Sequence, residues 1–278
     1  MAKGDCNKLL EFLVCEPLDT NLFRGQSRDF KTGQVFGGQV LGQAIKAAYQ
    51  TVEDGRRIHS AHAYFLTRGD VNAPIIYEVD RSLDGRAFSS RRVVAIQHGQ
   101  QIFHLSASFQ RPEEGLEYHR SWMLPKDALD EAVERALPSD HPFQGEFFDI
   151  HFIPREQSSE PDTVQFWVKS KQALPDTFQC HHSALAYFSD MGLLYSTLVP
   201  HFGDLKGLAN CGKDIVVASL DHAIWYHRPF RVDDWLFYTC KAQSTSNSRG
   251  LGFGRIYSKD GTLVASTSQE GLIRQKRQ

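Results

Sequence analysis

A repeated pattern constrains this 278-residue chain more than any other feature of its sequence. The segments 62–69 and 222–229 share the order His-Ala-x-aromatic-x-x-Arg, one in each half of the chain. Self-similarity of this kind indicates that a structural unit occurs twice. Three positions before the shared histidine the copies differ, with His59 in the first and Ser219 in the second. We therefore expect a duplicated fold whose chemistry lies in the differences between the copies.

The segments around each copy of the pattern predict the same order of elements, a helix followed by antiparallel strands. In the first copy the apolar spacing predicts a helix over 35–49, whose small residues suit close packing against other backbone. Strands follow at 57–66, 74–79, 87–97 and 101–110. The second copy predicts a strand at 164–171, a helix at 181–195, and strands at 214–226, 235–244, 250–258 and 262–274. The predicted fold class is α+β, with two repeats that each wrap an antiparallel sheet around a long helix.

The predicted domains follow from this duplication. We expect an N-terminal domain over 1–112, a linker over 113–160, and a C-terminal domain over 161–278. The linker is rich in proline and acidic residues, and its segment 126–137 has the spacing of a solvated helix.

Composition narrows the functional class. The formal net charge of -2 gives no reason to expect a nucleic-acid partner. The five cysteines are scattered and form no C-x-x-C pair, which favours a reducing compartment over a disulfide framework or zinc cluster. No apolar run is long enough for a bilayer, and the chain lacks a secretory leader pattern and a C-terminal Ser-Lys-Leu signal. We expect a cytoplasmic protein without a membrane partner.

Three polar residues of the second copy are candidates for chemistry. Asp190 is the one carboxylate in an otherwise apolar predicted helix, where an unpartnered acid is costly. The matching segment of the first copy, 31–52, has no acid. Ser219 and Gln269 lie on predicted strands, where a lone polar residue is usually only structural. Taken alone, Asp190 is explained equally well as a surface acid and as a catalytic acid. Only contact among the three side chains would indicate a catalytic site.

Other patterns favour structural interpretations. Strand alternation would place Ser219 and His222 on opposite faces, which argues against a local Ser-His pair. The histidines lack the spacing of metal ligands, so we expect no metal site. The glycine-rich segment 250–254 lies among strands without a following helix, so it indicates close packing or a bulge rather than a phosphate loop.

Several motifs taken together resemble the acyl-CoA thioesterase II family, over about residues 9–274. They are Phe23-Arg24-Gly25-Gln26, Gln34-Val35-Phe36-Gly37-Gly38-Gln39, Arg86-Ala87-Phe88-Ser89-Ser90-Arg91-Arg92-Val93, Ser106-Ala107-Ser108-Phe109-Gln110, and Asp221-His222-Ala223-Ile224-Trp225-Tyr226-His227-Arg228-Pro229. The resemblance implies a double hotdog fold and hydrolysis of fatty acyl-CoA to free fatty acid and CoA. It also implies a water-activating catalytic trio of Asp190, Ser219 and Gln269, with no cofactor, since CoA is part of the substrate.

Two alternatives remain open at this point. An acyl-CoA hydratase or dehydratase of a related fold would place a histidine five residues after the aspartate, whereas this chain has Tyr195 there. A non-catalytic acyl-ligand binder would not need the three polar residues. Exposed sheet edges lead us to expect a homo-oligomer, either a dimer or a tetramer.

Overall fold

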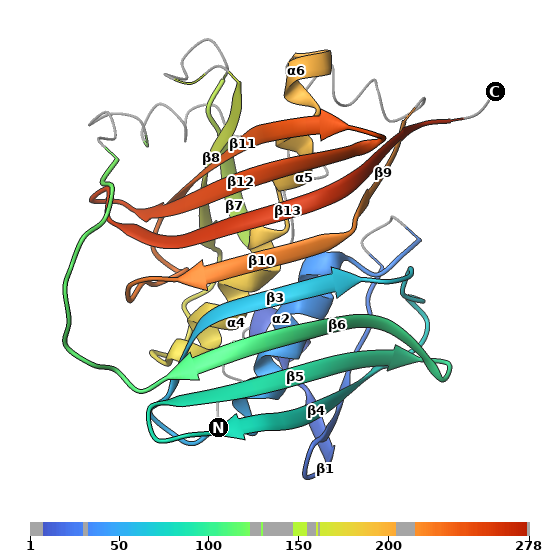
Figure 1. The fold of residues 1–278 in the computed structure, drawn as a ribbon, viewed down its shortest axis with the longest axis vertical. Coiled ribbons are helices and arrows are strands. Elements are labelled where there is room, and N and C mark those ends of the chain that lie inside the picture. Colours follow the sequence, from blue (N-terminus) through green and yellow to red (C-terminus); the bar gives the residue numbers. More distant parts are fainter. Residues whose placement is uncertain are drawn as a thin grey trace, which may run out of the picture. The chain divides into compact units, whose positions relative to one another are not determined.

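The computed structural model describes residues 8–29, 33–122, 129, 147–154, 160, 162–203 and 215–276 (Figure 1). These residues form two compact units. The first unit comprises Met1–Leu116, Gln172–Phe188 and Ala223–Tyr226. The second comprises Glu117–Lys171, Ser189–His222 and His227–Gln278. Both units consist of antiparallel strands with few helices, which is the predicted α+β class.

In the first unit an antiparallel sheet packs against one long helix, α2 (Gly37–Tyr49), which contacts β4, β5 and β6. The helix is almost entirely buried because its small and apolar side chains line most of its surface. A short helix, α1 (Lys8–Leu13), packs on α2. The strand order is β1 (Glu16–Asp19), β2 (Leu22–Gly25), β4 (Ile75–Asp84), β5 (Phe88–Gln97), β6 (Gln100–Gln110), β3 (Arg57–Phe65) and β10 (Asp221–Tyr226). The predicted helix and strands of the first copy are therefore present.

The helix α4 (Phe178–Ser189) packs very closely on α2 within this first unit. A Cβ atom at Gly38 would overlap the carbonyl oxygen of Tyr187. One at Gly42 would lie 2.9 Å from the carbonyl oxygen of Ser183. Both positions require glycine because the backbones of the two helices approach too closely for any side chain.

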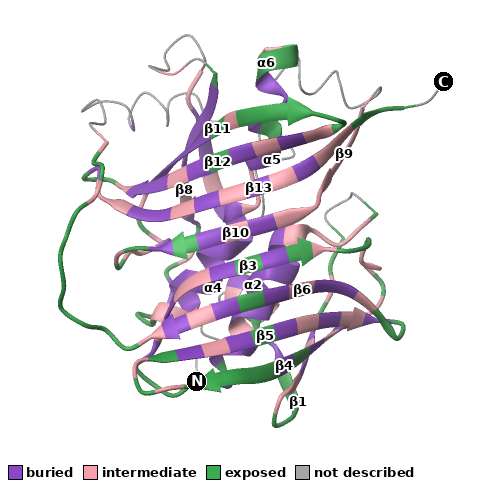
Figure 2. Ribbon diagram, in the orientation of Figure 1, coloured by how far each residue is buried: buried purple, intermediate pink, exposed green. Residues whose placement is uncertain are grey.

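The second unit has the strand order β13 (Leu263–Gln275), β12 (Arg249–Ser258), β11 (Leu236–Ser246), β8 (Thr163–Ser170) and β7 (Phe148–Phe152), and β9 (Ile215–Ser219) also pairs with β13. Two short helices, α5 (Leu193–Ser196) and α6 (Val199–Phe202), follow α4. The buried positions of β12 and β13 recur at about every second residue (Figure 2). This alternation turns one face of each strand toward the core.

The structure corrects three predictions of elements. The helix predicted over 181–195 ends at Ser189, and the strand predicted over 214–226 is interrupted at Leu220. Residues 148–152, predicted as linker, form the buried strand β7, which pairs with β8. The segment is apolar enough to be a strand, but its proline-rich and acidic neighbours obscured that pattern. The helix predicted over 126–137 lies outside the described residues except for Leu129.

The compact units also differ from the sequential division into 1–112, 113–160 and 161–278. Gln172–Phe188 and Ala223–Tyr226 group with the N-terminal residues, because α4 packs on α2 and β10 pairs with β3. Within the described residues, no helix combines the length and hydropathy needed to cross a membrane.

Candidate active site

Asp190 lies at the point where α4 ends. It is the first residue after the helix, in a turn that leads through Met191 and Gly192 into α5. Gly192 has φ of 91°, and a Cβ atom there would lie 2.8 Å from the ring of Phe166. Glycine adopts this left-handed conformation without steric cost, which allows the chain to leave the helix here. The prediction that Asp190 lies inside a helix is therefore wrong, because the turn releases its side chain from the helix surface.

Ser219 and Gln269 are placed by strand register. Ser219 is the last residue of β9 and stands opposite Gly271 on β13. Gln269 is two residues before Gly271 on the same strand, so it projects from the same face. The sheet therefore brings the serine and the glutamine together, although 50 residues separate them in sequence.

The three predicted site residues meet in the second unit. Gln269 Nε2 lies 2.6 Å from Asp190 Oδ1 and 2.9 Å from Ser219 Oγ. The Ser219 hydroxyl lies 3.5 Å from the same Asp190 oxygen. Gln269 is fully buried, whereas Asp190 and Ser219 are partly exposed. The glutamine side chain is thus inside the protein, whereas the carboxylate and the hydroxyl reach its surface.

The hydrogen bonds fix the orientation of the Gln269 amide. Of the two polar atoms of the amide only Nε2 carries hydrogens, so Nε2 must face the Asp190 carboxylate, and its second hydrogen is directed to Ser219. The Oε1 atom is buried and has no partner among the described residues. Because both N–H donors are used, Gln269 holds the carboxylate and the hydroxyl at fixed separation. A neutral amide does not accept a proton near pH 7, so Gln269 cannot itself act as a base.

The end of α4 is held by two residues that sequence reasoning did not assign to the site. The Tyr238 hydroxyl donates to the carbonyl of Ser189 at 2.9 Å and lies 2.9 Å from Thr267 Oγ1. His222 Nε2 lies 2.9 Å from Ser189 Oγ. Burial raises the pKa of Tyr238 well above its usual value, so its hydroxyl stays protonated. Together these contacts anchor the residue directly before Asp190.

His222 is a neutral structural histidine. It is fully buried, and burial lowers its pKa to about 3. The expectation that strand alternation separates it from Ser219 rests on a continuous strand, whereas Leu220 interrupts the strand. His222 nevertheless binds Ser189 rather than Ser219, so no Ser-His pair forms. Its place in the repeated pattern was the one sequence signal for this role.

The glycine-rich strand β12 packs closely against its neighbours, as predicted for segment 250–254. Cβ atoms at Gly252 and Gly254 would lie 2.9 Å from the carbonyl oxygen of Leu193 and 2.6 Å from the ring of Tyr238, respectively. The helix α5 and the Tyr238 ring occupy the space that side chains on β12 would fill. The strand is therefore a packing surface rather than a phosphate loop.

The described residues of the first copy form no equivalent of this site. His59, the counterpart of Ser219, lies 2.8 Å from Ser108 Oγ, and burial lowers its pKa. Gln50 follows α2 where Asp190 follows α4. Among the described residues, no group of three or more His, Cys, Asp or Glu side chains has an arrangement that could hold a metal ion.

Fold and site together define this chain as a double hotdog protein. Residues 26–110 match the model of the acyl-CoA thioesterase N-terminal domain, and residues 139–272 match that of acyl-CoA thioesterase. A protein of unknown function with a hot dog fold from Alicyclobacillus acidocaldarius superposes with a TM-score of 0.76 at 17% identity, covering 96% of this chain and 97% of that one.

Closer relatives establish the family. Acyl-CoA thioesterase 2 of Haemophilus influenzae is 39% identical over 96% of this chain and 97% of its own. Human acyl-coenzyme A thioesterase 8 is 34% identical over 99% of this chain and 92% of its own. The structure of an acyl-CoA thioesterase II from Mycobacterium marinum has a TM-score of 0.82 at 36% identity, covering 96% and 97% of the two chains. The chain belongs to the acyl-CoA thioesterase II family.

Proposed function

We propose that this protein hydrolyses fatty acyl-CoA to free fatty acid and CoA by direct attack of water, with Asp190, Ser219 and Gln269 as the catalytic residues. Family membership supports the reaction class, acyl-CoA thioester hydrolysis. The single structural observation that carries the site assignment is the contact of Gln269 with both Asp190 and Ser219.

Each residue has a distinct role in this mechanism. Asp190 is the general base and accepts a proton from a water molecule as the water oxygen attacks the thioester carbonyl. Ser219 binds the water through its hydroxyl, which can donate one hydrogen bond and accept two. Gln269 keeps the base and the hydroxyl in position, which lowers the entropic cost of reaching the attack geometry.

The tetrahedral intermediate then collapses with cleavage of the carbon–sulfur bond. The electron pair of that bond leaves with the CoA sulfur, and the carbonyl re-forms as the fatty acid. An ordinary thiol has a pKa of about 8.5, so the thiolate is a good leaving group and needs no dedicated acid. The proton held by Asp190 returns to solvent or to the thiolate, and the carboxylate is ready for the next turnover.

The two alternative functions, a hydratase and a passive acyl-ligand binder, do not account for the contacts among Asp190, Ser219 and Gln269. A hydratase would need a histidine near the carboxylate, whereas the residue five positions beyond Asp190 is Tyr195, which lies on α5 and is 36% exposed. A passive acyl-ligand binder would have no use for a buried glutamine that aligns an acid and a hydroxyl. Both alternatives are decided by assay.

The test measures free thiol released from a series of acyl-CoA substrates, repeated in water labelled with oxygen-18. We expect thiol release, one label atom in the fatty acid, and no trapped acyl-enzyme. Absence of thiol release with every chain length would refute hydrolysis. A covalent acyl-enzyme in quenched samples would refute direct attack by water.

We also propose a cell location and an oligomeric state for the protein. A cytoplasmic enzyme of lipid metabolism is consistent with the unpaired Cys15, Cys180 and Cys240. A homodimer or homotetramer would cover large exposed side chains on strands, such as Tyr64 and Phe253. Light scattering across a concentration series tests the assembly, and a monomer throughout would contradict it.

A further inference from the structure

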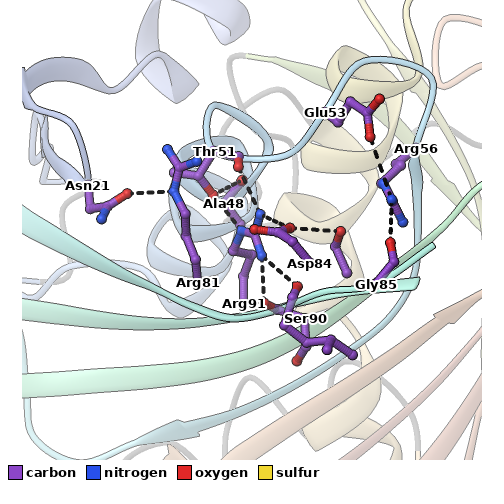
Figure 3. A network of polar contacts seen from close by, with 12 residues as sticks. Asn21, Ala48, Thr51, Glu53, Arg56, Arg81, Asp84, Gly85, Ser90 and Arg91 are labelled. Carbon is purple, nitrogen blue, oxygen red and sulfur yellow. Dashed lines mark hydrogen bonds and ion pairs between the residues drawn. The ribbon is translucent and has the colours of Figure 1, made fainter. Parts of the chain in front are cut away.

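A cavity of about 590 Å³ lies in the first unit, and its lining includes none of the residues of the proposed catalytic trio. It is bounded by the segment that follows α2, from Gln50 to Arg56, and by the β4–β5 turn with the flanking strands. Figure 3 shows the polar network at this place. Pockets of this size accommodate small molecules.

Four arginines line the cavity together with only two acids. The arginines are Arg56, Arg81, Arg86 and Arg91, and the acids are Glu53 and Asp84. Both acids already have partners. Asp84 pairs with Arg91 at 2.6 Å, and Glu53 pairs with Arg111 at 2.6 Å. The cavity therefore has an excess of positive charge that its own side chains do not balance.

The deeper arginines are held rigidly. Arg91 is 1% exposed and donates to Thr51 Oγ1, to the Thr51 carbonyl and to the Leu83 carbonyl, at 2.9 to 3.0 Å. Its hydrogen bond to Asp84 lowers the pKa of that carboxyl, which stays ionised. These bonds fix the guanidinium before any ligand arrives, so little conformational freedom is lost on binding.

Arg56 retains unused hydrogen-bonding capacity. Its Nη2 atom donates to the Gly85 carbonyl at 2.6 Å, while its Nε and Nη1 atoms are buried and have no partner among the described residues. Its ion pair with the exposed Glu53 is long, at 3.5 Å. A buried cation with so little compensation is costly, and a nearby anion would relieve that cost.

The outer arginines are available to a ligand. Arg86 is exposed, and no hydrogen bond or ion pair ties its side chain to another described residue. Arg81 is exposed and uses its Nε atom to bind Asn21 at 2.9 Å. Planar guanidinium groups bind two oxygens of a phosphate at once, a geometry that favours phosphate over spherical anions.

We propose that this cavity is a binding site for a small phosphate-bearing anion, clasped by Arg81 and Arg86 over the fixed charges of Arg56 and Arg91. The four arginines and two acids leave a formal excess of two positive charges, which a phosphate dianion would neutralise. The site is separate from the proposed hydrolytic trio and does not depend on it.

The experiment titrates the purified protein with inorganic phosphate and with adenosine 3′,5′-bisphosphate by isothermal calorimetry at low ionic strength. Acetate serves as the non-phosphate anion. We expect saturable binding of at least one phosphate probe and none of acetate. Equal affinity of both phosphate probes identifies free phosphate as sufficient, whereas tighter binding of the bisphosphate identifies a nucleotide source.

Matched variants locate the binding. Arg86→Ala should weaken phosphate affinity roughly tenfold, the value of one charge-assisted hydrogen bond. Arg92→Ala is the control, because Arg92 is an exposed neighbour of Arg91 on β5 that does not line the cavity. Absence of saturable phosphate binding, binding of acetate as tight as that of phosphate, or equal weakening by Arg92→Ala would overturn the proposal. Asp190→Asn should bind phosphate like the wild type, whatever its hydrolytic activity.

Discussion

The chain turns after each of the two long helices, α2 and α4, and different residues hold the two turns. After α2 the chain turns at Gln50 and Thr51, and the buried guanidinium of Arg91 holds that turn. After α4 the chain turns at Asp190, and the neutral groups of Tyr238 and His222 hold the preceding Ser189. The first turn is closed by a fixed cation, whereas the second leaves a carboxylate at the protein surface.

This difference extends to the strands that face the turns. β5 carries Arg91, while β12 carries glycine at positions 250, 252 and 254. Without side chains there, α5 and the Tyr238 ring pack directly on β12. Side-chain volume on the facing strand thus differs between the two turns, with an arginine beside the first and glycines on the strand that faces the second.

The largest expected effect comes from removing the acid at the end of α4. Asp190→Asn preserves the size of the side chain but not its basicity, so kcat should fall roughly a thousandfold. Thiol release at saturating acyl-CoA measures this. Asp80→Asn, the same substitution at an exposed acid on β4 of the first unit, is the control and should leave kcat unchanged. A folded Asp190→Asn enzyme with near wild-type kcat would remove Asp190 from the mechanism.

The anchors of the two turns should differ in their contribution to stability. Arg91→Met leaves the Thr51 and Leu83 carbonyls without their donor and should lower the free energy of unfolding by about 3 kcal/mol. Tyr238→Phe removes one hydroxyl at the other turn and should cost about 1 kcal/mol. Urea unfolding followed by circular dichroism measures both. Equal losses would show that the two turns are held with equal strength.

The repeated pattern provides a matched pair for catalysis. Ser219→Ala removes the hydroxyl from the proposed water site and should lower kcat roughly thirtyfold. His59→Ala alters the counterpart in the first copy and should leave kcat within about twofold, with a small loss of stability from its bond to Ser108. Steady-state kinetics and thermal unfolding separate the two outcomes. A larger kinetic loss in His59→Ala would reverse the assignment of the active copy.

Acid should destabilise the fold through two buried histidines, His182 in the first unit and His222 in the second. Burial lowers the pKa of each to about 3. Between pH 6.5 and 3 the unfolded chain binds protons that the folded chain does not, so stability falls as pH falls. The slope is about 1.4 kcal/mol per pH unit for each histidine.

Urea midpoints between pH 7 and pH 5 measure this slope, and a variant assigns it. His222→Gln should reduce it, because glutamine does not titrate. An unaltered slope in His222→Gln would show that His222 is not a buried neutral group.

The sequence predicted those features that depend on local patterns or on the family resemblance. Segments rich in β-branched and aromatic residues, separated by turn residues, predicted the strands of the first copy. The contrast between His59 and Ser219 indicated the second copy as the place of the chemistry. The meeting of Asp190 with Gln269 was expected only from the resemblance, since the two are 79 residues apart. The exit of the chain at Asp190 depends on the φ of Gly192 beside Phe166, a tertiary contact. The arginine cavity was missed because Arg56 and Arg91 come from segments far apart in the sequence, and no local pattern places their side chains together.

The glycine contact between α2 and α4 has a consequence for how this duplicated protein can be divided. A fragment that starts at residue 161 would retain all three residues of the proposed trio. It would lack the surface of Gly38 and Gly42, on which the backbone of Ser183 and Tyr187 rests. The helix α4, which ends directly before Asp190, thus packs against a helix of the N-terminal repeat. The two repeats are therefore not separable modules. The C-terminal repeat, which holds the proposed trio, depends on the N-terminal repeat for the packing of α4.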